Sequence, residues 1–130
     1  MAVNTNVHQG DIIEVFFRLP DGGIKTHPAL VVSEPIQDET YWGRDGKNYD
    51  DFFYVLLIST KNYIPEYCVE IKPEWVVGTP LDKQSYFVTH IISACRYDDI
   101  VHNRGTCLNE DAFNEVLDKM LKNVFNITFG

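Results

Sequence analysis

Two apolar runs rich in β-branched and aromatic residues stand near the start of the chain, over residues 10–17 and 27–33. Between them lies the turn sequence Leu19-Pro20-Asp21-Gly22-Gly23. Strand-forming runs on either side of a Pro-Asp-Gly-Gly turn predict an antiparallel β-hairpin.

The middle of the chain predicts further strands. Residues 52–59 form a continuous apolar run of strand length, which is typical of a central strand buried on both faces. Residues 67–71 and 86–95 predict two more strands, and residues 98–104 a last short strand or a loop. Before the central strand, residues 34–51 are acidic and contain glycines together with Tyr41, Trp42 and Tyr49, so we expect a long polar loop there.

The pattern changes to helical near the C-terminus, where the sequence predicts a helix from about Asn109 to Lys122. Asn109 can cap its first turn, and the acidic Glu110 and Asp111 complement the positive end of the helix dipole. One apolar stripe follows at helical spacing, and it consists of Phe113, Val116, Leu117, Met120, Leu121 and Val124. This stripe indicates packing against a core.

About five short strands and one terminal helix predict a mainly β fold, a small antiparallel barrel that carries a helix. The length of 130 residues suits one domain spanning 1–130, and 45% hydrophobic residues are ample for a core. No apolar run approaches the roughly 20 residues of a membrane-spanning helix. The N-terminal residues lack the basic and apolar regions of a secretory signal.

Charge and cysteine content narrow the class of protein. Eleven Lys and Arg against nineteen Asp and Glu give a net charge of −8, whereas proteins that hold nucleic acid usually present a basic groove. Cys68, Cys95 and Cys107 match no zinc or redox spacing, and we interpret them as reduced, mostly buried thiols of a cytoplasmic protein.

The amino-acid sequence of this hairpin is more specific than its predicted shape. A strand that opens Gly10-Asp11-Ile12, followed by a strand that contains Pro28-Ala29-Leu30-Val31-Val32-Ser33, resembles the start of PemK/MazF-family toxins. The resemblance continues through the core strand ending in Ser59-Thr60, the run Ser85-Tyr86-Phe87-Val88, and Gly105-Thr106 before the helix.

The resemblance implies an SH3-like barrel that pairs into a homodimer. It also implies the toxin of a type II toxin-antitoxin system, a cytoplasmic endoribonuclease that cleaves single-stranded mRNA without metal or cofactor. Cleavage would leave a cyclic phosphate and a 5′-hydroxyl. A cognate antitoxin, with an acidic tail that fills the RNA groove, would be its protein partner.

Carried over by position, the catalytic arginine of the family falls on His27 and the catalytic threonine on Ser59, with Thr60 next to it. Histidine replaces a permanent charge by a group that titrates near neutrality, although imidazole is a competent general acid or base. Ser59 retains the hydroxyl. The alternatives are an exposed turn histidine and a strand-end hydroxyl bonded to backbone.

Three cations are candidates for contacts with RNA phosphates. Arg18 and Lys25 flank the hairpin turn, and Lys61 follows Thr60 directly. Solvated surface charges are the alternative interpretation of all three. His8, His90 and His102 form no ligand spacing with one another or with the cysteines, so no metal site is expected.

A second hypothesis belongs to another class of protein. The missing arginine and the net charge of −8 are also compatible with a catalytically inactive SH3-like barrel that binds a protein partner. A basic surface around His27 would favour the nuclease, and an acidic or apolar one the binding module.

Overall fold

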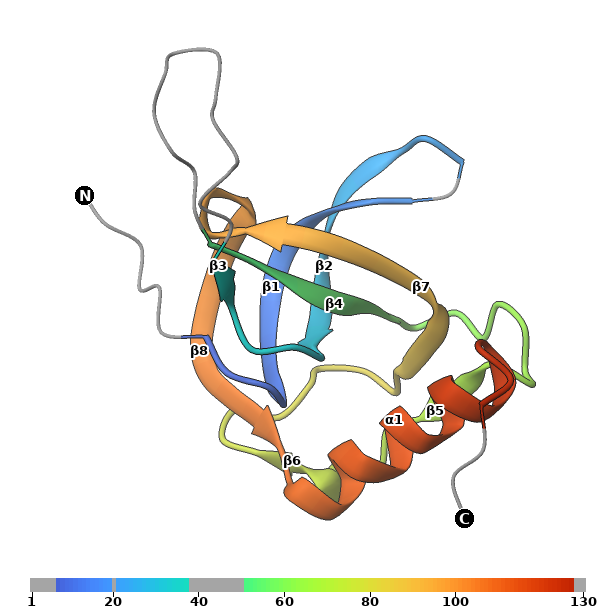
Figure 1. The fold of residues 1–130 in the computed structure, drawn as a ribbon. Coiled ribbons are helices and arrows are strands. Elements are labelled where there is room, and N and C mark those ends of the chain that lie inside the picture. Colours follow the sequence, from blue (N-terminus) through green and yellow to red (C-terminus); the bar gives the residue numbers. More distant parts are fainter. Residues whose placement is uncertain (1–6, 20, 38–50, 128–130) are drawn as a thin grey trace.

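Eight antiparallel strands, two short 3₁₀ helices (Pro73–Trp75 and Tyr97–Asp99) and one C-terminal α-helix are the regular elements of the described chain (Figure 1). The computed structural model describes residues 7–19, 21–37 and 51–127. The elements are β1 (Asp11–Arg18), β2 (Ile24–Val31), β3 (Ile36–Gln37), β4 (Asp51–Ser59), β5 (Cys68–Glu70), β6 (Val76–Val77), β7 (Tyr86–Arg96), β8 (Ile100–Leu108) and α1 (Glu110–Asn123).

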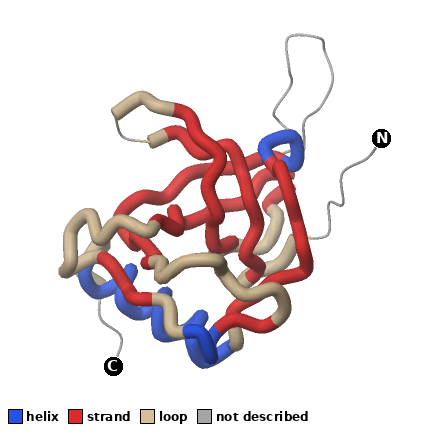
Figure 2. Tube along the Cα trace, turned by 180° about the vertical axis from the view of Figure 1, so that it is seen from behind, coloured by secondary structure: helices blue, strands red, loops and turns tan. Residues whose placement is uncertain are grey.

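The strands form one curled sheet in the order β5-β7-β4-β2-β1-β8-β6, and β3 pairs with β4 outside this path. Helix α1 lies across one end of the curl, while the β1–β2 hairpin extends away from it (Figures 1 and 2). The expected fold class, mainly β and antiparallel with a C-terminal helix, is confirmed.

Side chains on the two faces of the sheet fill two separate cores, because successive residues of a strand point to opposite faces. The inner cluster, enclosed by the strands, consists of Val7, Ile13, Val15, Phe17, Ala29, Val31, Phe53, Val55, Leu57, Cys68, Val88, Ile91, Cys95 and Ile100. The helix-side cluster consists of Ile12, Leu30, Leu56, Ile58, Ile71, Phe87, Leu108, Ala112, Phe113 and Val116. Strand β4 contributes to both, which confirms the central strand buried on both faces.

The hairpin turn is closed by short-range hydrogen bonds. The Leu19 N–H donates to the Gly23 carbonyl at 2.7 Å, and the Gly23 N–H donates to Asp21 Oδ1 at 2.8 Å. The return strand begins at Ile24, three residues earlier than the apolar run that predicted it. Ile24, Lys25 and Thr26 are exposed and show no apolar alternation, yet their backbone continues the ladder as far as the pair Arg18 and Ile24.

The last strand also differs from the prediction. The segment expected as a short strand or loop over 98–104 is the long strand β8, which runs through Gly105 and Thr106 to Leu108. Its middle is exposed and polar, so the sequence lacks an apolar run there, and the pairing with β1 is what maintains the strand. The short strands β3 and β6 were not predicted. The expected loop at 34–51, with Tyr41, Trp42 and Tyr49, lies mostly outside the described residues.

Helix α1 follows the prediction closely. It begins after Asn109, whose side chain accepts a hydrogen bond from the Ala112 N–H at 2.8 Å, and it ends one residue beyond Lys122. Ala112, Phe113 and Val116 of its apolar face are buried in the helix-side cluster. No helix among the described residues is long and apolar enough to cross a membrane.

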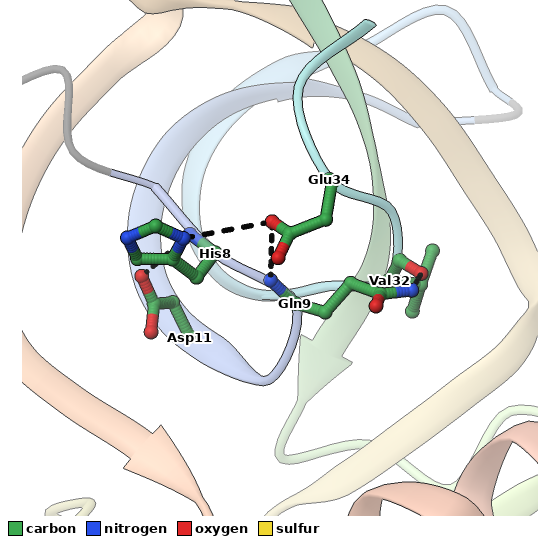
Figure 3. Close-up of polar contacts among 5 residues, drawn as sticks. All are labelled: His8, Gln9, Asp11, Val32 and Glu34. Atoms are coloured by element: carbon green, nitrogen blue, oxygen red, sulfur yellow. Dashed lines mark hydrogen bonds and ion pairs between the residues drawn. The ribbon is translucent and has the colours of Figure 1, made fainter.

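The entry to β1 is tied to the segment that follows β2 (Figure 3). The Gln9 N–H donates to Glu34 Oε2 at 3.2 Å, its side-chain amide donates to the Val32 carbonyl at 3.0 Å, and His8 Nδ1 lies 3.6 Å from the same Glu34 oxygen. The His8 N–H donates to Asp11 Oδ2 at 2.9 Å. His8 therefore has a structural role on the surface.

The three cysteines are free thiols. Cys68 and Cys95 are buried, as expected, and Cys107 is half-buried. Burial, with a smaller effect of the Asp99 charge, raises the pKa of Cys95 to about 12. This thiol therefore stays protonated and unreactive near neutral pH.

The two adjacent phenylalanines of β1 test the assignment of faces. Phe17 is 0% exposed in the inner cluster, whereas Phe16 is 53% exposed. We expect Phe17→Ala to lower the free energy of unfolding by about 3–5 kcal/mol and Phe16→Ala by less than about 1 kcal/mol. Urea denaturation monitored by circular dichroism measures both. Equal losses would contradict the register of β1.

Candidate functional site

His27 and Ser59 meet at the ends of neighbouring strands. Strand β2 pairs with β4 in a register that includes Ala29 with Leu57. Continuing that antiparallel register by two residues sets His27 opposite Ser59. His27 is two residues from Ala29 in β2, and Ser59 is two residues from Leu57 in β4. Because Ala29 and Leu57 belong to the inner cluster, His27 and Ser59 lie on that face too.

A third residue extends this row onto the next strand. Tyr86, the first residue of β7, is paired directly with Ser59 and packs against the inner cluster. The row His27–Ser59–Tyr86 therefore crosses β2, β4 and β7 at one edge of the inner face. Sequence reasoning did not single out Tyr86, because its place beside Ser59 depends on long-range pairing of strands.

The His27 ring is half-buried and uncharged near neutral pH. Desolvation by burial is the main cause that lowers its pKa below 6.5, and the nearby Lys25 charge lowers it further. A hydrogen bond with the Ile58 backbone opposes the shift only in part. Among the described side chains, only His27 Nε2 and His90 Nδ1 are buried nitrogens without a hydrogen-bond partner. The neutral imidazole thus keeps one ring nitrogen that is buried and has no hydrogen-bond partner among the described residues.

The expected phosphate-binding cations do not all gather here. Lys25 pairs with Phe17 across the hairpin, on the inner face, and its charge acts on His27. Arg18 pairs with Ile24, so it points to the opposite face near the hairpin tip. The structure therefore brings Lys25, but not Arg18, to the row.

Ser59 and its two successors lie in different environments. Ser59 is 8% exposed, and its Oγ accepts a hydrogen bond from the Lys61 N–H at 3.1 Å. The Ser59 hydroxyl hydrogen remains free to be donated. Lys61 is exposed, with its Nζ 4.9 Å from the centre of the Tyr63 ring. Thr60 lines a pocket on the other face of the sheet.

That pocket has a volume of about 230 Å³ and is bounded by β1, the end of β4, the β6–β7 loop and β8. Its polar lining includes Glu14, Lys83, His102 and Arg104. His102 Nε2 lies 3.9 Å from Glu14 Oε2. Sequence reasoning missed this group, although Glu14 is the one charge inside the apolar run of residues 12–17.

The loop that borders the pocket is fixed at both ends. Gly78 has a φ of +98°, and a Cβ built there would come within 2.9 Å of the Gly105 carbonyl oxygen. Thr106 Oγ1 donates to the Thr79 carbonyl at 3.2 Å, and Ser85 Oγ donates to the Lys83 carbonyl at 2.9 Å. Only glycine fits at position 78 without strain.

Metal ligands do not cluster in this region or elsewhere in the described chain. Across residues 7–19, 21–37 and 51–127, no three His, Cys, Asp or Glu side chains come together in a way that could hold a metal ion.

Comparison with solved structures finds a protein with the same fold as this chain. A solved structure described as an endoribonuclease in complex with its cognate antitoxin, from a Mycobacterial species, superimposes with a TM-score of 0.55. The two proteins share a fold. The match covers 95% of this chain and 99% of that chain at 14% sequence identity. No family model and no curated protein matches the sequence.

The surroundings of His27 predict that the pKa of its imidazole is lowered. We expect the imidazole pKa, followed by ¹H–¹³C NMR of the ring, to lie below 6.5. Replacing Lys25 by Gln removes a repulsive positive charge and should move this pKa upward. Lys122→Gln on α1 serves as the matched control, because Lys122 is paired with Asp118 at 3.0 Å. A His27 pKa unmoved by Lys25→Gln would contradict the proximity of the two side chains.

Proposed function

We propose that this chain is a PemK/MazF-like toxin, an endoribonuclease that cleaves single-stranded mRNA in the cytoplasm without metal. The support is the fold it shares, over 95% of its length, with an endoribonuclease solved in complex with its antitoxin. The observation that carries the chemistry is the row of His27, Ser59 and Tyr86 beside Lys25. We further propose that residues 1–130 form one such domain, which pairs as a homodimer and is inhibited by a cognate antitoxin.

The cleavage is a transesterification. The ribose 2′-oxygen attacks phosphorus and loses its proton, the bond from phosphorus to the 5′-oxygen breaks, and that oxygen gains a proton. The products are a 2′,3′-cyclic phosphate and a 5′-hydroxyl. Such a reaction needs a base, an acid, and donors for the charge that develops on the phosphate oxygens.

The residues of the row and Lys25 suit two of these roles, the base and the donors to the phosphate oxygens. A neutral His27 can take the 2′-hydroxyl proton, which a permanently charged arginine cannot do. The charge that an arginine would supply to the phosphate comes instead from Lys25, which lies on the same face. Ser59 can donate its hydroxyl hydrogen to a phosphate oxygen, while Lys61 and Thr60 lie next to it in the chain.

The net charge of −8 does not by itself oppose this function, because binding depends on the local field. It does favour the second hypothesis, an inactive binding module, if cleavage is absent. Wild-type protein without activity, combined with a His27→Arg variant that gains it, would establish that hypothesis.

Removing the proposed base gives the central test. We expect His27→Ala to reduce cleavage of a fluorogenic single-stranded RNA by about 10²–10⁴-fold. His8→Ala, which alters an exposed histidine paired with Glu34, should retain wild-type activity. In the wild type, activity should fall on the acid side, with a midpoint below pH 6.5, because protonation removes the base. Full activity of His27→Ala would refute the assignment.

Chelation tests the metal-independent mechanism. The family chemistry needs no metal, and the described residues bring no ligand group of three together. We therefore expect the rate of RNA cleavage to be unchanged after dialysis against excess EDTA. A loss of activity that is restored by added Mg²⁺ or Mn²⁺ would overturn this mechanism.

A further inference from the structure

The 230 Å³ pocket adjoins the proposed catalytic row but is distinct from it. Pro28, which follows His27 in β2, and Thr60, which follows Ser59, line the pocket. They lie on the face of the sheet opposite to the row. Residues adjacent in a chain have Cα atoms about 3.8 Å apart. The pocket and the row therefore lie at the same strand positions, on opposite faces of the sheet.

The size and apolar surface of the pocket suit a small flat ligand. Its volume is below the roughly 300 Å³ at which sites for drug-sized ligands begin. Pro28, Pro80 and Leu81 contribute rigid or bulky apolar surface. Unpaired RNA bases are recognised in this way, by contacts to the flat face and hydrogen bonds along the edge.

The charged and titratable side chains of the pocket are two carboxylates, Glu14 and Asp82, two cations, and the imidazole of His102. The only ion-pair partner of the Glu14 carboxylate among the described residues is His102 at 3.9 Å, which is too long for a hydrogen bond. Both carboxylate oxygens are therefore available to a ligand. Lys83 and Arg104 are exposed lining residues, so their charges can meet a phosphate at the solvent side.

We propose that this pocket binds one unpaired nucleobase, with a preference for guanine. The inference rests on the proposed function in that the base belongs to the RNA substrate. Guanine presents two N–H donors on one edge, which match the two oxygens of Glu14. Uracil presents one N–H between two carbonyl oxygens, and these would face the carboxylate. Adenine and cytosine, with one amino group each, rank between them.

Mononucleotides test the pocket without any cleavage. We expect 5′-GMP to bind the full chain about tenfold more tightly than 5′-UMP, as measured by titrations followed in ¹H–¹⁵N NMR spectra. The amide shifts should centre on Glu14, Lys83 and Arg104. Equal affinities, or shifts centred elsewhere, would overturn the proposal.

Single-residue variants distinguish recognition of the base from contact with the phosphate. Glu14→Gln should abolish the preference for GMP, while Glu110→Gln, an exposed acid on α1, should leave it intact. Arg104→Gln should lower the affinities for GMP and UMP by the same factor, because it removes only a phosphate contact. A GMP preference that survives in folded Glu14→Gln would contradict the role of the carboxylate.

The two proposals fail in distinguishable ways. Selective GMP binding by a protein that cleaves no RNA would leave the base pocket standing and remove the nuclease. RNA cleavage by a protein that binds GMP and UMP alike would do the reverse.

Discussion

The position of β2 between β1 and β4 is the constraint on which the rest of the structure depends. Its register with β1 fixes the hairpin, and its register with β4 sets His27 opposite Ser59. A slip by one residue would turn His27 to the helix-side face and Pro28 to the inner face. Such a slip would also move Ala29 and Val31 out of the inner cluster and Leu30 into it, so the packing of both clusters enforces the geometry of the site.

In the proposed function, a histidine stands at the position of the family's arginine, and this changes which side chain supplies charge and which supplies the base. An arginine supplies charge and hydrogen bonds, whereas a buried neutral imidazole supplies basicity. Lys25 then has two effects in the proposed function, because its charge lowers the pKa of His27 and would also contact the phosphate. Base and cation are separate side chains here, and each can be varied without the other.

The elements that could be predicted from sequence are those whose signal is local. The hairpin, the strand β4 and the helix with its Asn109 cap all depend on short-range patterns of apolar and turn residues. The length of β8 could not be predicted, because exposed polar residues such as His102 and Arg104 are held in the strand by distant partners. The same reason hid the pocket and the pairing of Tyr86 with Ser59, whereas the positions of His27 and Ser59 followed from the resemblance.

The Gly78–Gly105 approach has a consequence for how such a protein can change. Backbone contact at one end of the β6–β7 loop, two hydroxyl hydrogen bonds and the packing of Leu81 on the helix-side cluster hold the loop in place without using the side chains of Pro80 and Asp82. Folding therefore places few demands on Pro80 and Asp82, although both border the pocket. If the pocket binds a ligand as proposed, exchange of these residues would change the ligand preference while the strands stay the same.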